Sequence, residues 1–113
     1  MPYIEAKLSI KLDENKKNQL QLKLTDIISK DFSKPKTYIM VNIEDDKTIY
    51  MAEKKLDKGA YICVKLFGTA TKPSCQNSTK KICDVLSEYG IENSNVYVTY
   101  HPVDLWGWKG FMF

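Results

Sequence analysis

Apolar and polar positions alternate along the first segment of the chain. Within residues 3–12, apolar side chains occupy every second position, namely Ile4, Ala6, Leu8, Ile10 and Leu12. A period of two is typical of a β-strand that buries one face. Because the alternation begins at the very start of the chain, we expect the N-terminus to be held inside a sheet.

A helical pattern follows this strand. Lysine and glutamine separate the members of one apolar helix face, which are Leu20, Leu24, Ile27 and Ile28. Asp13 is suited to cap the first turn. The pattern ends near Phe32, and Pro35 prevents its continuation because proline favours an extended residue before it. A strand rich in β-formers then covers residues 38–43.

The second half of the chain repeats this order. Residues 61–67 are almost continuously apolar, which predicts a central strand covered on both faces. Ser74 is suited to cap a second helix, whose apolar face contains Ile82, Val85, Leu86 and Tyr89. Gly90 is a favourable residue to end that helix, and residues 96–100 predict another strand.

Three further segments lie outside these two units. Residues 48–51, after a turn at residues 45–47, predict a short edge strand that pairs back onto the strand before it. Residues 53–58 are polar and predict an exposed loop. The tail, residues 106–113, is strongly aromatic and could add a last short strand.

The order strand, helix, strand therefore occurs twice. Tyr3 and Tyr61 are separated by 58 residues, as are Tyr38 and Val96, so the chain contains a structural repeat of about residues 2–58 and 59–113. We expect each βαβ unit to be right-handed with parallel strands. Together they predict one α/β (α+β) domain over the 113 residues, with a four-stranded mixed sheet and two helices on one face. The other face then requires another subunit to cover it.

Charge and cysteine content argue against several classes of protein. The net charge is only +3, and the lysines occur singly or in pairs, so we expect no nucleic-acid partner. The three cysteines, Cys63, Cys75 and Cys83, fit neither CxxC nor zinc spacing, which indicates reduced thiols. His101 is the only histidine. We therefore expect no metal site.

No targeting segment is recognisable in the sequence. The N-terminus lacks the basic, apolar and small-residue series of a secretory signal, and no apolar run approaches the roughly 20 residues of a membrane span. We therefore expect a cytoplasmic protein without a membrane partner. Secretion without a signal peptide stays open as an alternative.

Pro2 is the first candidate for chemistry. Methionine before a small residue is normally removed, and removal would expose the secondary amine of Pro2. A free α-amine has a pKa near 7.7–8.0, and burial lowers it further because the charged form loses its water. A neutral amine near pH 7 is a competent general base. The alternative is that Pro2 merely protects the terminus.

Five short motifs extend over nearly the whole chain. They are Met1-Pro2-Tyr3-Ile4, Ser33-Lys34-Pro35 with Tyr38-Ile39-Met40, Leu66-Phe67-Gly68, Asn95-Val96-Tyr97-Val98-Thr99-Tyr100, and Gly107-Trp108-Lys109-Gly110 with Phe113. In order and spacing they resemble the macrophage migration inhibitory factor (MIF) family of the tautomerase superfamily. That family has Gly-Lys-Pro, Arg-Val-Tyr-Ile-Asn-Tyr and Gly-Trp-Asn at the corresponding places.

The resemblance implies a homotrimer whose three sheets form a barrel wrapped by six helices. It also implies an isomerase that needs no cofactor and catalyses keto–enol tautomerisation of phenylpyruvate-like or dopachrome-like compounds. A small keto or enol compound would be the substrate. The family is further associated with cytokine-like signalling, so a cell-surface receptor is a second expected partner.

The same resemblance implies roles for individual residues. Pro2 would remove a proton from the carbon next to a carbonyl. Lys34 would hold the carboxylate of the substrate or stabilise its enolate, and the backbone N–H of Phe67 would bind a substrate oxygen. The neighbouring subunit would contribute Tyr97 to the pocket, and Thr99 stands where the family usually has Asn.

Aromatic side chains would form the walls of this pocket. The resemblance implies walls formed by Tyr38, Trp108 and Phe113. For Trp106 the sequence leaves a pocket wall and plain core packing equally open.

Several family features are replaced in this chain. Gly59-Ala60-Tyr61-Ile62 stands in place of a Cys-x-x-Cys segment, so thiol oxidoreductase activity is not expected.

Other departures concern the loops. Residues 51–55 replace the family's Phe-Gly-Gly-Ser loop, and residues 69–73 replace a glycine-rich turn. Residues 102–106 are more similar to the dopachrome tautomerase branch than to MIF itself. These departures leave the substrate, the branch of the family and receptor contact open.

Three readings of the sequence therefore remain. The first is a tautomerase, and the second is a MIF-like signalling protein with vestigial or weak tautomerase activity. The third is a ferredoxin-like module that binds single-stranded nucleic acid through its exposed sheet and aromatic side chains. The modest net charge argues against this third reading.

Overall fold

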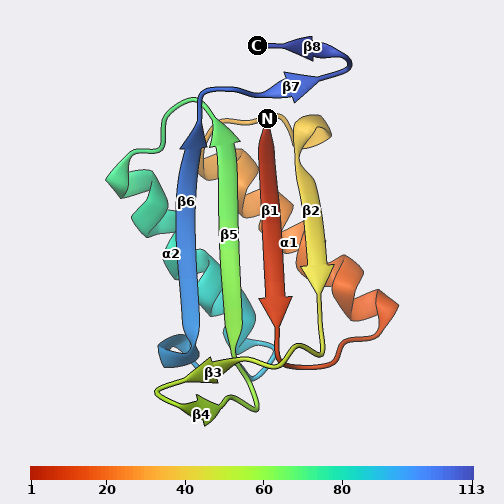
Figure 1. Cartoon of the computed structure of the whole chain (residues 1–113), viewed down its shortest axis with the longest axis vertical. Coiled ribbons are helices and arrows are strands. Elements are labelled where there is room, and N and C mark those ends of the chain that lie inside the picture. Colours follow the sequence, from red (N-terminus) through yellow and green to blue (C-terminus); the bar gives the residue numbers. More distant parts are fainter.

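The computed structural model describes residues 1–113 and contains two βαβ units in one sheet (Figure 1). The main elements are β1 (Pro2–Leu8), α1 (Glu14–Asp31), β2 (Met40–Glu44), β5 (Ala60–Phe67), α2 (Lys72–Ser87) and β6 (Val96–Val103). The strand order is β2-β1-β5-β6. Strands pair in parallel within each unit, and β1 and β5 join the units in antiparallel. Both helices cover the same face of the sheet, which confirms the predicted fold class.

The core lies between the helices and that face of the sheet. Alternate residues of β1 are buried, and α1 and α2 contribute apolar residues from the faces that the sequence predicted. Side chains without exposed surface in this core are Ile4, Ala6, Leu8, Leu20, Leu24, Ile28, Ile62, Val64, Leu66, Ile82 and Leu86. Neither helix is long and apolar enough to cross a lipid bilayer.

The helix ends agree only in part with the sequence prediction. Asp13 caps α1 as predicted, because its Oδ1 accepts the backbone N–H of Lys16 at 2.8 Å. The predicted cap of α2, Ser74, is wrong. Thr71 caps this helix by accepting the N–H of Ser74 at 3.3 Å, and Pro73 fits the first turn because its missing N–H is not needed there.

The first two strands are shorter than the alternation suggests. β1 ends at Leu8, and one further hydrogen bond, from the Ser9 N–H to the Gly59 carbonyl at 3.0 Å, continues its register against β5. β2 begins only at Met40, since residues 36–38 form a 3₁₀ turn, Lys36–Tyr38. A second 3₁₀ turn, Asn93–Asn95, precedes β6.

Two small hairpins lie at opposite ends of the sheet (Figure 1). β3 (Tyr50–Met51) pairs with β4 (Lys54–Lys55), so the predicted pairing of residues 48–51 with the preceding strand is wrong. Residues 53–58 are largely exposed, as predicted, but they include the short strand β4. Ala52 and Glu53 both have positive φ, which is the geometry of a two-residue hairpin turn.

The C-terminal tail forms the second hairpin. β7 (Gly107–Trp108) pairs with β8 (Phe111–Met112) across Lys109 and Gly110, which also have positive φ. The tail therefore contains two short strands instead of one. They form a separate small sheet and lie beyond the N-terminal end of β1 (Figure 1).

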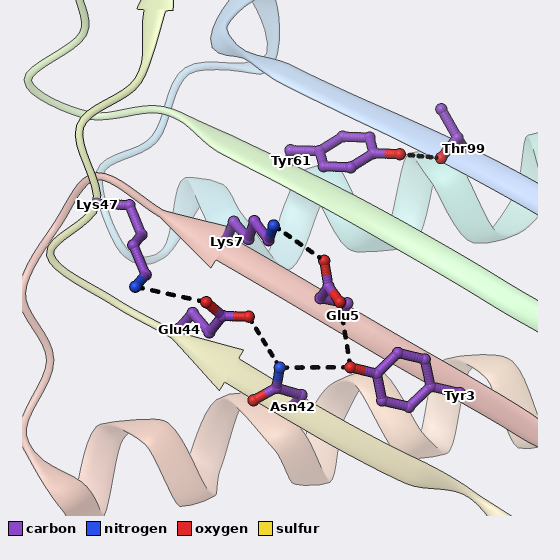
Figure 2. Close-up of polar contacts among 8 residues, drawn as sticks. All are labelled: Tyr3, Glu5, Lys7, Asn42, Glu44, Lys47, Tyr61 and Thr99. Atoms are coloured by element: carbon purple, nitrogen blue, oxygen red, sulfur yellow. Dashed lines mark hydrogen bonds and ion pairs between the residues drawn. The ribbon is translucent and has the colours of Figure 1, made fainter.

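The second face of the main sheet is open and polar. Tyr3, Glu5 and Asn42 are linked there, because the Tyr3 hydroxyl donates to Glu5 at 3.1 Å and accepts from the Asn42 amide at 3.3 Å (Figure 2). Glu5 also pairs with Lys7 at 3.4 Å. Lys65 of β5 is exposed on this face. The prediction that β5 is covered on both faces is therefore wrong for the single chain.

Candidate active site

Pro2 is buried at the start of a central strand. It is the first residue of β1, its exposed fraction is below 2%, and it lies opposite Leu66 of β5. Met1 precedes it, so the Pro2 nitrogen is an amide in the full chain. The sheet register holds this nitrogen at one end of the fold (Figure 1).

Lys34 reaches toward the same end from the segment after α1. Ser33 has a φ of 53°, and the N–H of Lys34 donates to the Ser29 carbonyl at 2.9 Å. These features direct the lysine ammonium to the Phe67 carbonyl, to which it donates at 2.9 Å. The next residue, Gly68, has a φ of +108°, a conformation that glycine adopts without steric cost.

The backbone of Phe67 provides a hydrogen-bond donor beside Pro2. Its N–H donates to the carbonyl of Met1 at 3.1 Å, and that carbonyl is bonded directly to the Pro2 nitrogen. Without Met1, this N–H would lose its partner and could bind an oxygen of another molecule. Pro2, Lys34 and Phe67, which the resemblance implied as parts of one site, thus lie at the same end of the sheet.

The environment of the N-terminus disfavours positive charge. Partial burial, followed by the charge of Lys34, lowers the pKa of the Met1 amine below its ordinary value. Burial acts because an ammonium loses hydration, and Lys34 acts because like charges repel. An amine held here is therefore a stronger candidate for a neutral base than an exposed one.

The predicted aromatic residues form one continuous group. Tyr38 meets Trp108 edge to face with ring centroids 5.4 Å apart, and Trp108 stacks on Phe113 at 6.3 Å. Phe113 also contacts Phe67 at 5.5 Å between ring centroids. The tail hairpin thus carries Trp108 and Phe113 to the end of the sheet where Pro2 lies.

A cavity of about 420 Å³ opens between Pro2, Tyr38 and Trp108. Trp106, for which the sequence left two interpretations, also lines it. Sequence reasoning missed six other lining residues: Met1, Tyr3, Thr37, Ile39, Met40 and Gly107. The only signal for them is their position near Pro2, Tyr38 or Trp108 in the chain. The lining is largely apolar and suits a small ligand with a flat apolar part.

Tyr97 and Thr99 lie far from Pro2 within one chain. Pro2 aligns with Leu66 of β5, and Leu66 aligns with Pro102 of β6. Tyr97 is five residues before Pro102, which places it about 17 Å along the strand from the level of Pro2. Thr99 instead contacts the Tyr61 hydroxyl at 2.7 Å (Figure 2). Their predicted place in the pocket thus depends on a second subunit.

Other reactive groups do not gather at this end. No three side chains of histidine, cysteine, aspartate or glutamate converge as metal ligands would. All three cysteines are free, and Cys63 is buried. Burial raises the pKa of the Cys75 thiol and, together with Asp84, that of the Cys83 thiol. A raised pKa makes both thiols poorer nucleophiles.

Solved structures of similar shape come from several organisms. Leishmania major MIF2 has a TM-score of 0.91 and 25% identity, with coverage of 100% of this chain and 97% of that one. The MIF-like protein EhMIF of Entamoeba histolytica has a TM-score of 0.89 and 23% identity, covering 99% and 98%. MIF of Toxoplasma gondii has a TM-score of 0.91 and 15% identity, with coverage of 98% of this chain and 99% of that one.

Sequence comparison gives a family and no individual relative. No curated protein sequence matches this chain. The family model of macrophage migration inhibitory factor (MIF) matches residues 1–113, which is the full length of the chain. Since this match and the fold agree, the chain belongs to the MIF family.

Proposed function

We propose that this protein is a keto–enol tautomerase that uses the amine of Pro2 as its base and needs no cofactor. The observation that carries the proposal is the hydrogen bond from the Phe67 N–H to the carbonyl attached to the Pro2 nitrogen. It supports the presence of an oxygen-binding donor next to the proposed base. The cavity beside Pro2 and Tyr38 has room for a small aromatic 2-oxo acid.

The proposed reaction moves one proton and changes no other atom. Loss of Met1 makes Pro2 a terminal secondary amine, whose neutral form removes a proton from the carbon between the carbonyl and the aromatic ring. The negative charge moves onto the carbonyl oxygen, where the Phe67 N–H stabilises it, while the Lys34 ammonium holds the carboxylate of the substrate. The protonated amine then delivers the proton to this oxygen, which gives the enol and restores the base.

The proposal includes a homotrimer. Two observations support an assembly: Tyr97 and Thr99 lie too far from Pro2 to act in the same chain, and large apolar side chains are exposed at the sheet edge, on the β3–β4 hairpin and in the tail. These are Met40, Tyr50, Leu105, Phe111 and Met112. An aromatic group from a neighbouring chain would complete each pocket. Sedimentation should give three chains per particle, whereas a stable active monomer would refute this assembly.

A test of the base compares the chain that starts at Pro2 with one that carries an alanine before it. The first should convert phenylpyruvate between its keto and enol forms, and the second should not. The compound 2-oxo-3-pentynoate, by which the solved Pt0534 protein is inactivated, adds a second readout, because a free amine can add to its carbonyl-conjugated alkyne. It should label the Pro2 nitrogen only when that nitrogen is free, and label on another residue would refute the proposal.

Family membership also favours a second candidate, a MIF-like signalling protein with weak or vestigial turnover. This role would act through surface contacts with a receptor and would persist when Pro2 is blocked. Location in the cytoplasm, or secretion without a signal peptide, belongs to the same proposal. A receptor response that needs turnover would favour the enzyme, and a response that the blocked chain retains would favour signalling.

A further inference from the structure

A second hollow, of about 470 Å³, lies at the opposite end of the sheet from Pro2. We refer to it as the lysine pocket, because its lining includes Lys11, Lys16, Lys23 and Lys58. Four segments form it: the connection after β1, the first half of α1, the segment before β5 and the end of α2. Because β1 runs away from Pro2, these segments meet at the far end of the molecule (Figure 1).

The lysines converge from separate parts of the chain. Lys16 and Lys23 flank Gln19 with spacings of three and four residues, which places all three on one face of α1. Lys11 and Lys58 approach from two different connections. Among the four lysines only Lys23 has a carboxylate partner, Glu88 at 3.3 Å. Three ammonium groups are therefore free to bind a ligand.

The lysine pocket holds the charge excess of the whole chain. Its lining contains four of the 17 lysines and one of the 14 acidic residues, so the other 13 lysines and 13 acidic residues balance. Asp13 and Asp57 are close in sequence to Lys11 and Lys58, but neither aspartate lines the lysine pocket. Asp13 instead accepts the backbone N–H of Lys16. The net charge of +3 thus coincides with a concave surface.

The floor of the lysine pocket is apolar and partly aromatic. Ile10, Leu12 and Tyr89 supply this part of the lining. The Tyr89 hydroxyl donates to the Lys16 carbonyl at 3.4 Å, and the Lys23 ammonium lies 5.9 Å from the centre of its ring. A ligand with both negative charge and a flat apolar part would match this lining.

We propose that the lysine pocket binds a small organic phosphate of about nucleotide size. Its phosphates contact Lys11, Lys16 and Lys58, and its flat part packs against Tyr89. The volume is within the range of small-molecule sites, about 300–1,000 Å³, and lysine binds phosphate as a point charge. This site is separate from the cavity beside Pro2 and does not depend on the tautomerase proposal.

The test uses ATP, inorganic pyrophosphate and adenosine in calorimetric titrations of the full chain at physiological salt. We expect ATP to bind, pyrophosphate to bind more weakly and adenosine not to bind measurably. The triple variant Lys11→Ala, Lys16→Ala, Lys58→Ala should weaken ATP binding by more than about tenfold, because each charge-assisted hydrogen bond contributes about tenfold or more.

A charge-matched control separates a site from general attraction. Lys30→Ala, Lys72→Ala, Lys80→Ala removes three exposed lysines elsewhere and should change ATP affinity less than about twofold, since these lysines do not line the lysine pocket and salt screens interactions between exposed charges. Tyr89→Leu should weaken the binding of ATP but not the binding of pyrophosphate. Equal losses in the two triple variants, no binding of ATP, or binding of a sulfated oligosaccharide but not of ATP would each overturn the proposal. Phenylpyruvate turnover should be the same in both triple variants.

Discussion

Each end of the sheet has a hollow, but only the hollow at the far end is lined by lysine. At the Pro2 end, Lys34 donates to the Phe67 carbonyl at the end of β5 and does not line the cavity beside Pro2. At the far end, four lysines share a hollow with one acidic residue, Glu88. The volumes are similar, about 420 and 470 Å³.

The contrast shows that neighbours decide what a lysine does. A single ammonium beside a partly buried amine lowers the pKa of that amine, which favours base chemistry. Several ammonium groups without carboxylate partners instead attract anions, because their fields add in a concave surface. The same residue type thus supports a proton transfer at one end and ligand binding at the other.

The largest effect should come from blocking the amine at the Pro2 end. Inserting alanine before Pro2 converts its nitrogen into an amide, which cannot accept a proton. We expect phenylpyruvate turnover to fall by about 10²–10⁴-fold, the usual contribution of general acid–base catalysis. Circular dichroism and ATP titration should be unchanged, because neither the core nor the lysine pocket is altered. Turnover at the normal rate would mean that another residue is the base.

Removing the lysine at the Pro2 end should have an intermediate effect. Lys34→Ala deletes a charge-assisted hydrogen bond, which is worth roughly 1.5–3 kcal/mol, or about 10–150-fold in kcat/KM for phenylpyruvate. The methyl ester lacks the carboxylate, so its kcat/KM should fall less in this variant. Equal losses for acid and ester would show that Lys34 only orders the end of β5 through the Phe67 carbonyl.

The pH profile should show how the two lysine environments differ. Burial and Lys34 both disfavour a charged amine, so the pKa of the Pro2 amine should lie below that of a free terminus, as for Met1. Turnover should rise with pH through that lowered pKa, because only the neutral amine accepts a proton. Lys34→Ala should move this rise to higher pH, whereas Lys16→Ala at the far end should leave it in place.

The smallest effect should come from the helix caps, one near each end. Asp13 caps α1 at the lysine end, and Thr71 caps α2 at the other. Loss of either cap, by Asp13→Ala or Thr71→Ala, should lower the free energy of unfolding by about 0.5–2 kcal/mol in urea titrations. Asp13→Ala should also strengthen ATP binding, because it removes a negative charge next to Lys11. Unchanged affinity would count against the lysine pocket.

Local patterns were enough to predict the main elements. The alternation that starts at Ile4 depends only on the pleat of a strand, and the spacing of Leu20, Leu24 and Ile28 depends only on the helix period. Both predicted the buried faces seen in the structure. The cap at Asp13 is equally local, since its carboxylate binds an N–H three residues away. Motif order likewise predicted the family.

Pairings between distant segments were decided only by the tertiary structure. Residues 48–51 look like an edge strand, but the positive φ of Ala52 and Glu53 turns them into a hairpin of their own. Motifs alone likewise predicted Pro2, Lys34 and Phe67 as one site, whereas their contacts depend on the register of β1 against β5.

The lysine pocket was invisible in the sequence for the same reason. Its lysines occur singly or in pairs along the chain, and their spacing alone predicts no binding site. Folding brings Lys11, Lys16, Lys23 and Lys58 together, because the connection after β1, the start of α1 and the end of α2 all meet at one end of the sheet. Composition determined the net charge of +3, and the fold decided where that charge is concentrated.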